Sequence, residues 1–148
     1  MKPFQNDQLS TESGFTLIEI IIVVAIISIL AALASLSYRT QVMQTQVMTI
    51  YQEVNNFRAP YQTLINEGAG VTDFSPSVLN MPAQTKYCHF MVTAPAVNGL
   101  TTNAITCTIQ NLAYVQGGSI SLDRAADGSW QCRASAGVSK KYLPQACQ

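Results

Sequence analysis

The sequence contains little charge. Only 11% of its 148 residues are charged, and the 8 basic and 8 acidic side chains cancel. A chain without net charge lacks the basic composition of proteins that bind nucleic acid over their whole surface. The chain is nevertheless 48% hydrophobic, which is not typical of disordered proteins. Its length fits one domain of ordinary size.

Residues that form catalytic and metal sites are also scarce. The chain has one histidine and no Cys-x-x-Cys pair, so it does not predict a zinc site. It has no glycine-rich phosphate loop, no nucleophile elbow and no carboxylate pair with a reason to lie close. His89 has no acid spaced to orient it, and we expect it at the surface or in sheet packing. The sequence therefore predicts a protein that is not an enzyme and holds no cofactor or metal.

Apolar residues, by contrast, are concentrated in one long run. Phe15 to Tyr38 spans 24 residues, and Glu19 is the only formal charge between Gly14 and Arg39. A helix of that length reaches roughly 36 Å, longer than a bilayer core of about 30 Å. A carboxylate in such a span is costly and marks a functional residue. It requires a nearby cation, and a cut between Gly14 and Phe15 would create one, a new α-amino group.

A secretory signal peptide is the alternative interpretation of this run. Ala32-Leu33-Ala34 before Ser35 resembles a small-x-small cleavage site, and cleavage there would release a soluble binding protein. However, the residues that precede the run carry one basic and two acidic side chains, whereas a signal peptide begins with positive charge. Its apolar segment is also shorter and free of acids. We therefore favour a retained helix.

Both ends of the chain resemble one family. Gly14-Phe15-Thr16-Leu17-Ile18-Glu19-Ile20, followed by a long apolar helix, resembles the prepilin cleavage motif of type IV pilins. The segments Trp130-Gln131-Cys132 and Tyr142-Leu143-Pro144-Gln145-Ala146-Cys147 resemble the carboxy-terminal disulfide loop of major type IVa pilins. The resemblance implies an α+β fold, in which a long N-terminal helix, half of it transmembrane, packs on an antiparallel sheet.

The resemblance also implies how the chain is processed and divided. Residues 1–14 would be a cytoplasmic leader, which a membrane prepilin peptidase removes after Gly14, and Phe15 would then be N-methylated. Residues 15–38 would form the transmembrane and filament-core helix, 39–66 the amphipathic helix of the head, and 67–148 the rest of the head. Glu19 would neutralise the Phe15 amine of a neighbouring subunit, because a buried charge is costly once its partner is lost.

The implied function is that of a structural subunit. Copies of the chain, together with minor pilins, would polymerise on an assembly platform in the inner membrane. The subunit would span that membrane before assembly and belong to an extracellular fimbrium afterwards. The fibre would serve adhesion to a host surface, twitching motility and DNA uptake in natural competence. Two alternatives stay open: a minor or competence pilin, which the long acidic leader favours, and a type II secretion pseudopilin, which the terminal loop disfavours.

Two positions in the apolar helix depart from the family pattern. Many relatives have a glycine where this chain has Ser28, and a proline where it has Leu36. In those relatives the helix melts between the two positions on assembly. The resemblance therefore does not predict that the helix of this chain melts, although its serines could still compete for backbone hydrogen bonds.

The helix should become amphipathic after Arg39. Apolar residues recur there at steps of four and three: Met43, Val47, Ile50, Val54, Phe57, Tyr61 and Leu64. Such a stripe fits a coiled coil, but in a small domain it more often packs on the domain's own sheet, which we predict. Pro60 cannot donate to the carbonyl of Asn56, which predicts a kink or an early end. Gly68-Ala69-Gly70 should end the helix at the latest.

Four strands are predicted in the remainder. Residues 71–86 contain two prolines and no steady period, and are expected to be a surface connection. Turn residues occur at Asn98-Gly99, Gly117-Gly118 and Asp127-Gly128. They separate strands predicted at Tyr87–Thr93, Ala104–Gln116, Ser119–Leu122 and Ser129–Ala134. Successive hairpins of this kind form a four-stranded antiparallel sheet, one face of which would cover the amphipathic helix.

The four cysteines allow three pairings. A head outside the cytoplasm favours disulfides. The family resemblance implies a bridge between Cys132 and Cys147, which leaves Cys88 to pair with Cys107. The predicted Asn98-Gly99 turn would place these two nearly opposite each other on adjoining strands.

Basic residues gather near the carboxy terminus, at Arg124, Arg133, Lys140 and Lys141. From Arg39 onward the chain has seven basic and five acidic residues, a net charge of +2. We interpret the four as an ordinary solvated rim. The alternative is a DNA-contacting patch, whose weak, salt-sensitive attraction would need repetition along a filament.

Overall fold

A computed structural model describes residue 1, residues 14–68 and residues 72–148. Most of the predicted leader (residues 2–13), and Ala69, Gly70 and the first residue of the predicted surface connection, lie outside the described residues. The chain forms two compact units, Met1–Tyr38 and Arg39–Gln148.

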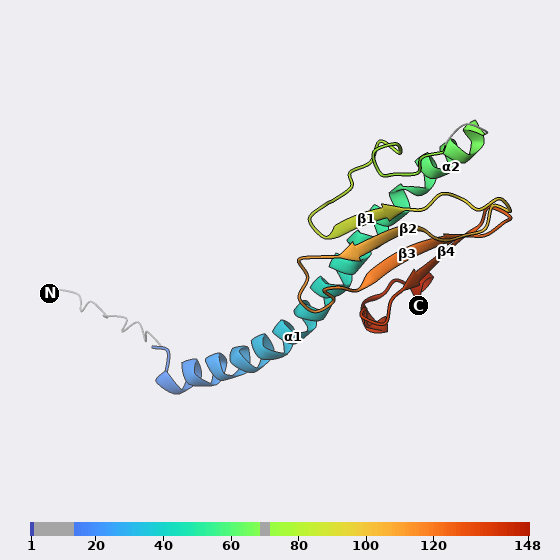
Figure 1. Ribbon diagram of the computed structural model, residues 1–148. Coiled ribbons are helices and arrows are strands. Elements are labelled where there is room, and N and C mark those ends of the chain that lie inside the picture. The colour runs from blue at the N-terminus through green and yellow to red at the C-terminus, as the bar shows by residue number, and fades with distance from the viewer. Residues whose placement is uncertain (2–13, 69–71) are drawn as a thin grey trace. The chain divides into compact units, whose positions relative to one another are not determined.

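The first helix is α1 (Leu17–Asn56; Figure 1), and a reciprocal cap forms its start. The Glu19 amide donates to Thr16 Oγ1 at 3.3 Å, and the Thr16 amide donates to Glu19 Oε2 at 2.9 Å. This is the capping-box arrangement, which satisfies two amides that the start of a helix leaves unpaired.

In the first unit, the helix runs without a break and its apolar side chains are exposed. Leu17, for example, is 80% exposed, and by length and composition the helix can cross a membrane. The Ser28 hydroxyl donates to the Val24 carbonyl at 2.7 Å, and the Ser35 hydroxyl to the Ala31 carbonyl at 2.8 Å. Both serines therefore bond within the helix and do not interrupt it.

In the second unit, the predicted stripe forms the helical side of the core. Five of its residues are completely buried, and Met43 and Leu64 at its two ends are half-buried. The five are Val47, Ile50, Val54, Phe57 and Tyr61, and they join the same apolar cluster as Phe90, Ile105 and Ile120 of the sheet. The prediction that this face packs on the chain's own sheet is confirmed.

The predicted interruption near Pro60 is also confirmed, one turn earlier than the proline itself. α1 ends at Asn56, Phe57 forms a turn, and α2 (Arg58–Glu67) follows. Pro60 lies in the first turn of α2, where a missing N–H costs nothing because that amide has no partner within the helix. α2 ends before Gly68, whose φ of 79° few other residues adopt.

The sheet has four antiparallel strands in the order β1-β2-β3-β4 (Figure 1). The strands are β1 (Cys88–Val92), β2 (Thr101–Ile109), β3 (Ser119–Arg124) and β4 (Trp130–Ala134). The predicted fold class is therefore confirmed. His89 is exposed on β1, as expected.

The predicted second strand, Ala104–Gln116, is wrong at both ends. β2 ends at Ile109 because the chain turns at Asn111, which has a φ of 60°. Leu112 and Val115, which the prediction placed in this strand, are buried as anchors of the loop that follows. β2 begins earlier than predicted, at Thr101, with a register shift before Ile105.

Both disulfides pair as expected. Cys88 bonds to Cys107 between β1 and β2, and Cys132 bonds to Cys147, which closes the carboxy-terminal segment onto β4. That segment contains two short 3₁₀ helices, η1 (Lys140–Tyr142) and η2 (Gln145–Cys147).

The carboxy-terminal loop is also held by backbone contacts to the β2–β3 turn. Ser135 and Ser119 exchange two hydrogen bonds, each 2.9 Å long. Beside them, Gly118 lies against Gly137, so close that a Cβ on Gly118 would lie 2.7 Å from Val138 Cγ2. The side chain of Gln44 on α1 donates to the Lys141 carbonyl at 2.9 Å and fixes the far side of the loop.

Candidate functional site

The first candidate site is the start of α1, where the predicted cleavage and assembly residues lie. Gly14 and Phe15 are exposed and precede the helix, and no described atom lies within 4 Å of the position that a Cβ would take on Gly14. Glu19 lies one turn further along. Its Oε2 accepts hydrogen bonds from the Thr16 amide at 2.9 Å and from the Thr16 hydroxyl at 2.8 Å.

Thr16 is a site residue that the sequence analysis did not single out. The signal was present, because Thr-x-x-Glu before an apolar run is the sequence signature of a capping box. The structure gives Glu19 a local role beyond its charge: it holds the first turn of the helix together through Thr16. The exposed carboxylate keeps further acceptor capacity, since an ionised carboxyl has about four lone-pair positions.

The second candidate site was the basic rim, and for Arg124 this expectation is wrong. Arg124 is only 8% exposed, because it faces the core side of the sheet, which α2 covers. Its guanidinium donates to Gln62 Oε1 at 3.2 Å and to the Gly99 carbonyl at 3.0 Å. It joins α2 to the β1–β2 turn and offers no charge at the surface.

Arg133 is exposed, but it is engaged by an acid on the neighbouring strand. Its guanidinium donates two hydrogen bonds of 3.0 Å to Asp123, and a third of 2.8 Å to Asn103 Oδ1. Partial burial alone would raise the pKa of Asp123, but the hydrogen bonds from Arg133 and the Asn103 amide, with the charge of Arg133, lower it below its ordinary value. By accepting a hydrogen bond from the Asn103 amide, Asp123 also holds the irregular part of β2 before Ile105, where Asn103 has a φ of 52°.

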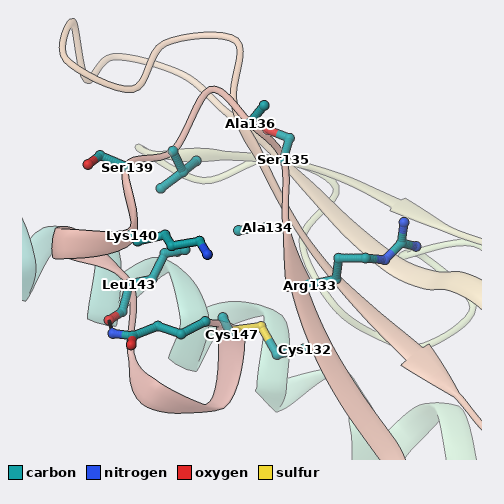
Figure 2. A pocket seen from close by; sticks show the side chains of 11 residues that line it. Cys132, Arg133, Ala134, Ser135, Ala136, Ser139, Lys140, Leu143 and Cys147 are labelled. Atoms are coloured by element: carbon teal, nitrogen blue, oxygen red, sulfur yellow. Dashed lines mark hydrogen bonds between the residues drawn. A yellow bond between two sulfur atoms is a disulfide. The ribbon is translucent and has the colours of Figure 1, made fainter.

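The two lysines remain at the surface, and the four basic residues do not form one patch. Lys141 places its ammonium over the Tyr142 ring, 4.7 Å from the centroid. Lys140 borders a cavity between β4 and the carboxy-terminal loop, whose 11 lining residues Figure 2 shows. Among the described residues, no group of three or more His, Cys, Asp or Glu side chains could hold a metal ion.

Comparison with known families matches both parts of the chain. Residues 44–148 match the family described as pilin (bacterial filament). This chain belongs to the pilin family. Residues 9–35 match the prokaryotic N-terminal methylation motif, a range that includes Gly14, Phe15 and Glu19.

Several pilin relatives match almost the whole chain. A probable minor fimbrial protein of Dichelobacter nodosus is 30% identical over 151 residues, which cover 91% of this chain and 94% of the relative. Fimbrial protein EcpC of Eikenella corrodens is 31% identical over 143 residues, which cover 93% of this chain and 91% of the relative. The type IV major fimbrial protein FimA of D. nodosus is 28% identical over 154 residues, which cover 94% of this chain and 97% of the relative.

These findings make the protein a fimbrial subunit of a type IV pilus, with a structural rather than an enzymatic role. Membership of the family and the methylation motif imply other pilin subunits as partners and processing by a prepilin peptidase. The exposed apolar helix indicates anchoring in a membrane before assembly into an extracellular pilus.

Proposed function

We propose that this pilin is cut between Gly14 and Phe15, methylated at the Phe15 amine, and assembled through a charge pair between Glu19 and the Phe15 amine of a neighbouring subunit. The observation that carries the proposal is the lone carboxylate of Glu19 at the start of an exposed apolar helix. An unpaired carboxylate is costly both in lipid and in the core of a filament, so Glu19 needs a cation before and after assembly. A new amine four residues away in sequence provides one on every copy.

The filament so formed serves adhesion and twitching motility, and is assembled from the inner membrane with other pilins. The abundance of this chain in sheared filaments defines its role there. A chain that starts at N-methyl-Phe15 and dominates the sheared fraction is the principal subunit, whereas the same start in a trace component marks a minor pilin.

Two variants separate the charge of Glu19 from its capping role. Glu19→Gln removes the charge but keeps an oxygen that can accept from Thr16. Thr16→Ala removes the two hydrogen bonds of the Thr16 hydroxyl, which form one half of the cap, but keeps the charge. We expect Glu19→Gln to accumulate in the membrane and to enter filaments poorly, and Thr16→Ala to assemble close to normally. Glu53→Gln, in the head part of the same helix, is the matched control.

The measurement is the ratio of filament-borne to membrane-borne subunit, determined on sheared filaments by immunoblot and intact mass. Normal assembly of Glu19→Gln would overturn the charge pair, and equal loss in Thr16→Ala would assign the effect to the cap. A mature chain that starts at Ser35 would instead contradict the whole processing scheme.

DNA uptake is the second candidate function, supported by the adjacent exposed lysines Lys140 and Lys141. Because Arg133 is neutralised by Asp123, these two lysines carry the attraction, which only repetition along a fibre could make effective. Binding of filaments to DNA should weaken steeply with salt. An affinity for DNA that does not change with salt concentration would contradict an electrostatic contact.

A further inference from the structure

The outer face of β1 carries two side chains of the kinds that bind soft metal ions. Cys88 and Phe90 of this strand are buried on the core side, whereas His89 and Met91 are exposed. Residues two apart on a strand point to the same face, about 6.6 Å from each other along the strand. Met91 is 60% exposed. An imidazole and a thioether therefore occupy neighbouring positions on a surface that is open to solvent.

Packing does not explain the exposed methionine. Methionine usually fills gaps in apolar cores, but Met91 is not part of the apolar cluster that the sheet forms with α1. Its direct partner on β2 is Thr106, and the partner of Thr106 on β3 is Ser121, so its neighbours across this face carry hydroxyls. Among the described residues, no hydrogen bond or ion pair engages the imidazole of His89. Both donor groups are therefore available to a ligand.

These two donors select the class of metal. Mg²⁺ and Ca²⁺ are bound by oxygen atoms, and Zn²⁺ takes four protein ligands, or three with a water. Asp123, an acid on the same face of the sheet, lies two strands away and is engaged by Arg133. Sulfur and imidazole nitrogen instead suit the soft ions Cu⁺ and Ag⁺, which accept two ligands in line. The pair therefore favours a soft monovalent ion.

No other part of the sequence combines the same two donors. Cysteine thiolate is the usual protein ligand of soft ions, but all four cysteines of the sequence are in disulfides. His89 is the one histidine. It lacks an acid to orient it, which argues against catalysis but not against binding of a soft metal. A soft ion on this head should therefore bind at β1.

We propose that His89 and Met91 together bind one soft monovalent metal ion, Cu⁺ or Ag⁺, through an imidazole nitrogen and the methionine sulfur. Bonds of about 2.0 Å to nitrogen and about 2.3 Å to sulfur place the two donor atoms roughly 4 Å apart. The unbranched side chain of methionine has three rotatable bonds and can bring its sulfur to that position. The site lies within one subunit, so it goes beyond the proposed assembly function and does not depend on it.

The test uses Ag⁺ with the full-length mature subunit in detergent, in a buffer free of chloride and without a histidine tag. Ag⁺ needs no reductant, whereas Cu⁺ would, and a reductant could open the disulfide of the partly exposed Cys132. NMR follows the ring protons of the one histidine and the methyl groups of isotopically labelled methionines. We expect the His89 ring and the Met91 methyl to shift together and to saturate at one ion per chain. Zn²⁺ should leave the Met91 methyl unchanged.

Three variants at exposed positions make the test specific. Met91→Leu keeps the size of the side chain and removes the sulfur, and His89→Gln removes the imidazole. Each should weaken Ag⁺ binding about tenfold or more, since even the indirect partners of a bound metal contribute about tenfold. Met48→Leu is the matched control, because it removes a sulfur on α1 that is 41% exposed, and it should leave binding unchanged. All three side chains are exposed, so the variants should fold.

Three results would overturn the proposal. A shift of the His89 ring with an unchanged Met91 methyl would mean that the imidazole binds the ion alone. Equal losses in Met91→Leu and Met48→Leu would mean that Ag⁺ binds exposed methionines without preference. No shift of either signal with roughly ten equivalents of Ag⁺ at about 0.1 mM protein would mean that β1 holds no soft-metal site.

Discussion

The contact between Gly118 and the carboxy-terminal loop leads to a quantitative prediction. A Cβ on Gly118 would lie 2.7 Å from Val138 Cγ2 and 3.0 Å from the Val115 carbonyl oxygen. Val138 is 4% exposed, and the Val115 carbonyl belongs to the backbone, which cannot move aside as a flexible side chain can. Gly118→Ala should therefore lower the free energy of unfolding by about 2 kcal/mol, within the usual cost of overpacking, about 1–3 kcal/mol.

A double-mutant cycle tests the cause of this loss. Val138→Ala removes two methyl groups and should cost about 2 kcal/mol by itself. In that background the Cγ2 contact is gone and only the carbonyl contact remains, so Gly118→Ala should cost about 1 kcal/mol less than it does alone.

Gly117→Ala is the matched control for the cycle. The φ of Gly117 is 79°, and none of the atoms that the structure describes would contact a Cβ there within 4 Å. An alanine there is strained by its backbone conformation and not by a neighbour, at a cost of about 1–2 kcal/mol. That cost should be the same with or without Val138.

The assay is urea unfolding of the oxidised, full-length mature chain in detergent. Fluorescence of Trp130, the one tryptophan in the sequence, reports on the core that it joins through Tyr61. Additive costs for Gly118→Ala and Val138→Ala, within about 0.4 kcal/mol, would refute the steric argument. A coupling of the same size between Gly117 and Val138 would refute it as well.

Two other predictions concern the head. Serine replacement of both Cys132 and Cys147 should cost about 3 kcal/mol of unfolding free energy on the loop-entropy account, measured by the same unfolding; an unchanged midpoint would contradict it. Acid should also destabilise the head through Asp123. Partial burial alone would raise the pKa of this carboxyl, but its hydrogen bonds to Arg133 and to the Asn103 amide lower the pKa below its ordinary value. Because the folded-state pKa lies below the unfolded value of about 3.9, this stabilisation is complete above that pH and is lost as pH falls through the folded-state pKa. Asp123→Asn should therefore flatten the acid side of a plot of melting temperature against pH, and parallel curves for variant and natural chain would contradict the assignment.

Periodic patterns and turn residues in the sequence were sufficient to predict the main helix and the strand pairing of the head. The stripe from Val47 to Tyr61 follows the helical repeat, and its residues are buried because that face meets the sheet. Asn98-Gly99 and Asp127-Gly128 mark hairpin turns that only particular residues form readily, and the strands on either side pair as antiparallel neighbours.

The features that the sequence did not predict depend on tertiary contacts. Leu112 and Val115 were expected in the second strand, but they anchor a loop whose Tyr114 hydroxyl donates to Gln46 Oε1 on α1 at 2.8 Å. Arg124 was expected at the surface because nothing in its neighbourhood along the chain indicates that α2 covers it. The cavity at Lys140 likewise arises from the way in which the closed loop packs on β4.

Complete burial of one disulfide has a kinetic consequence. Both Cys88 and Cys107 are 0% exposed, whereas Cys132 of the other bridge is partly exposed. A thiol reductant can reach the buried bridge only when the head opens, so with excess reductant its rate of reduction is limited by the rate of opening. Timed reduction followed by mass spectrometry therefore measures how often the head of a subunit opens, both in a membrane and in an intact fibre.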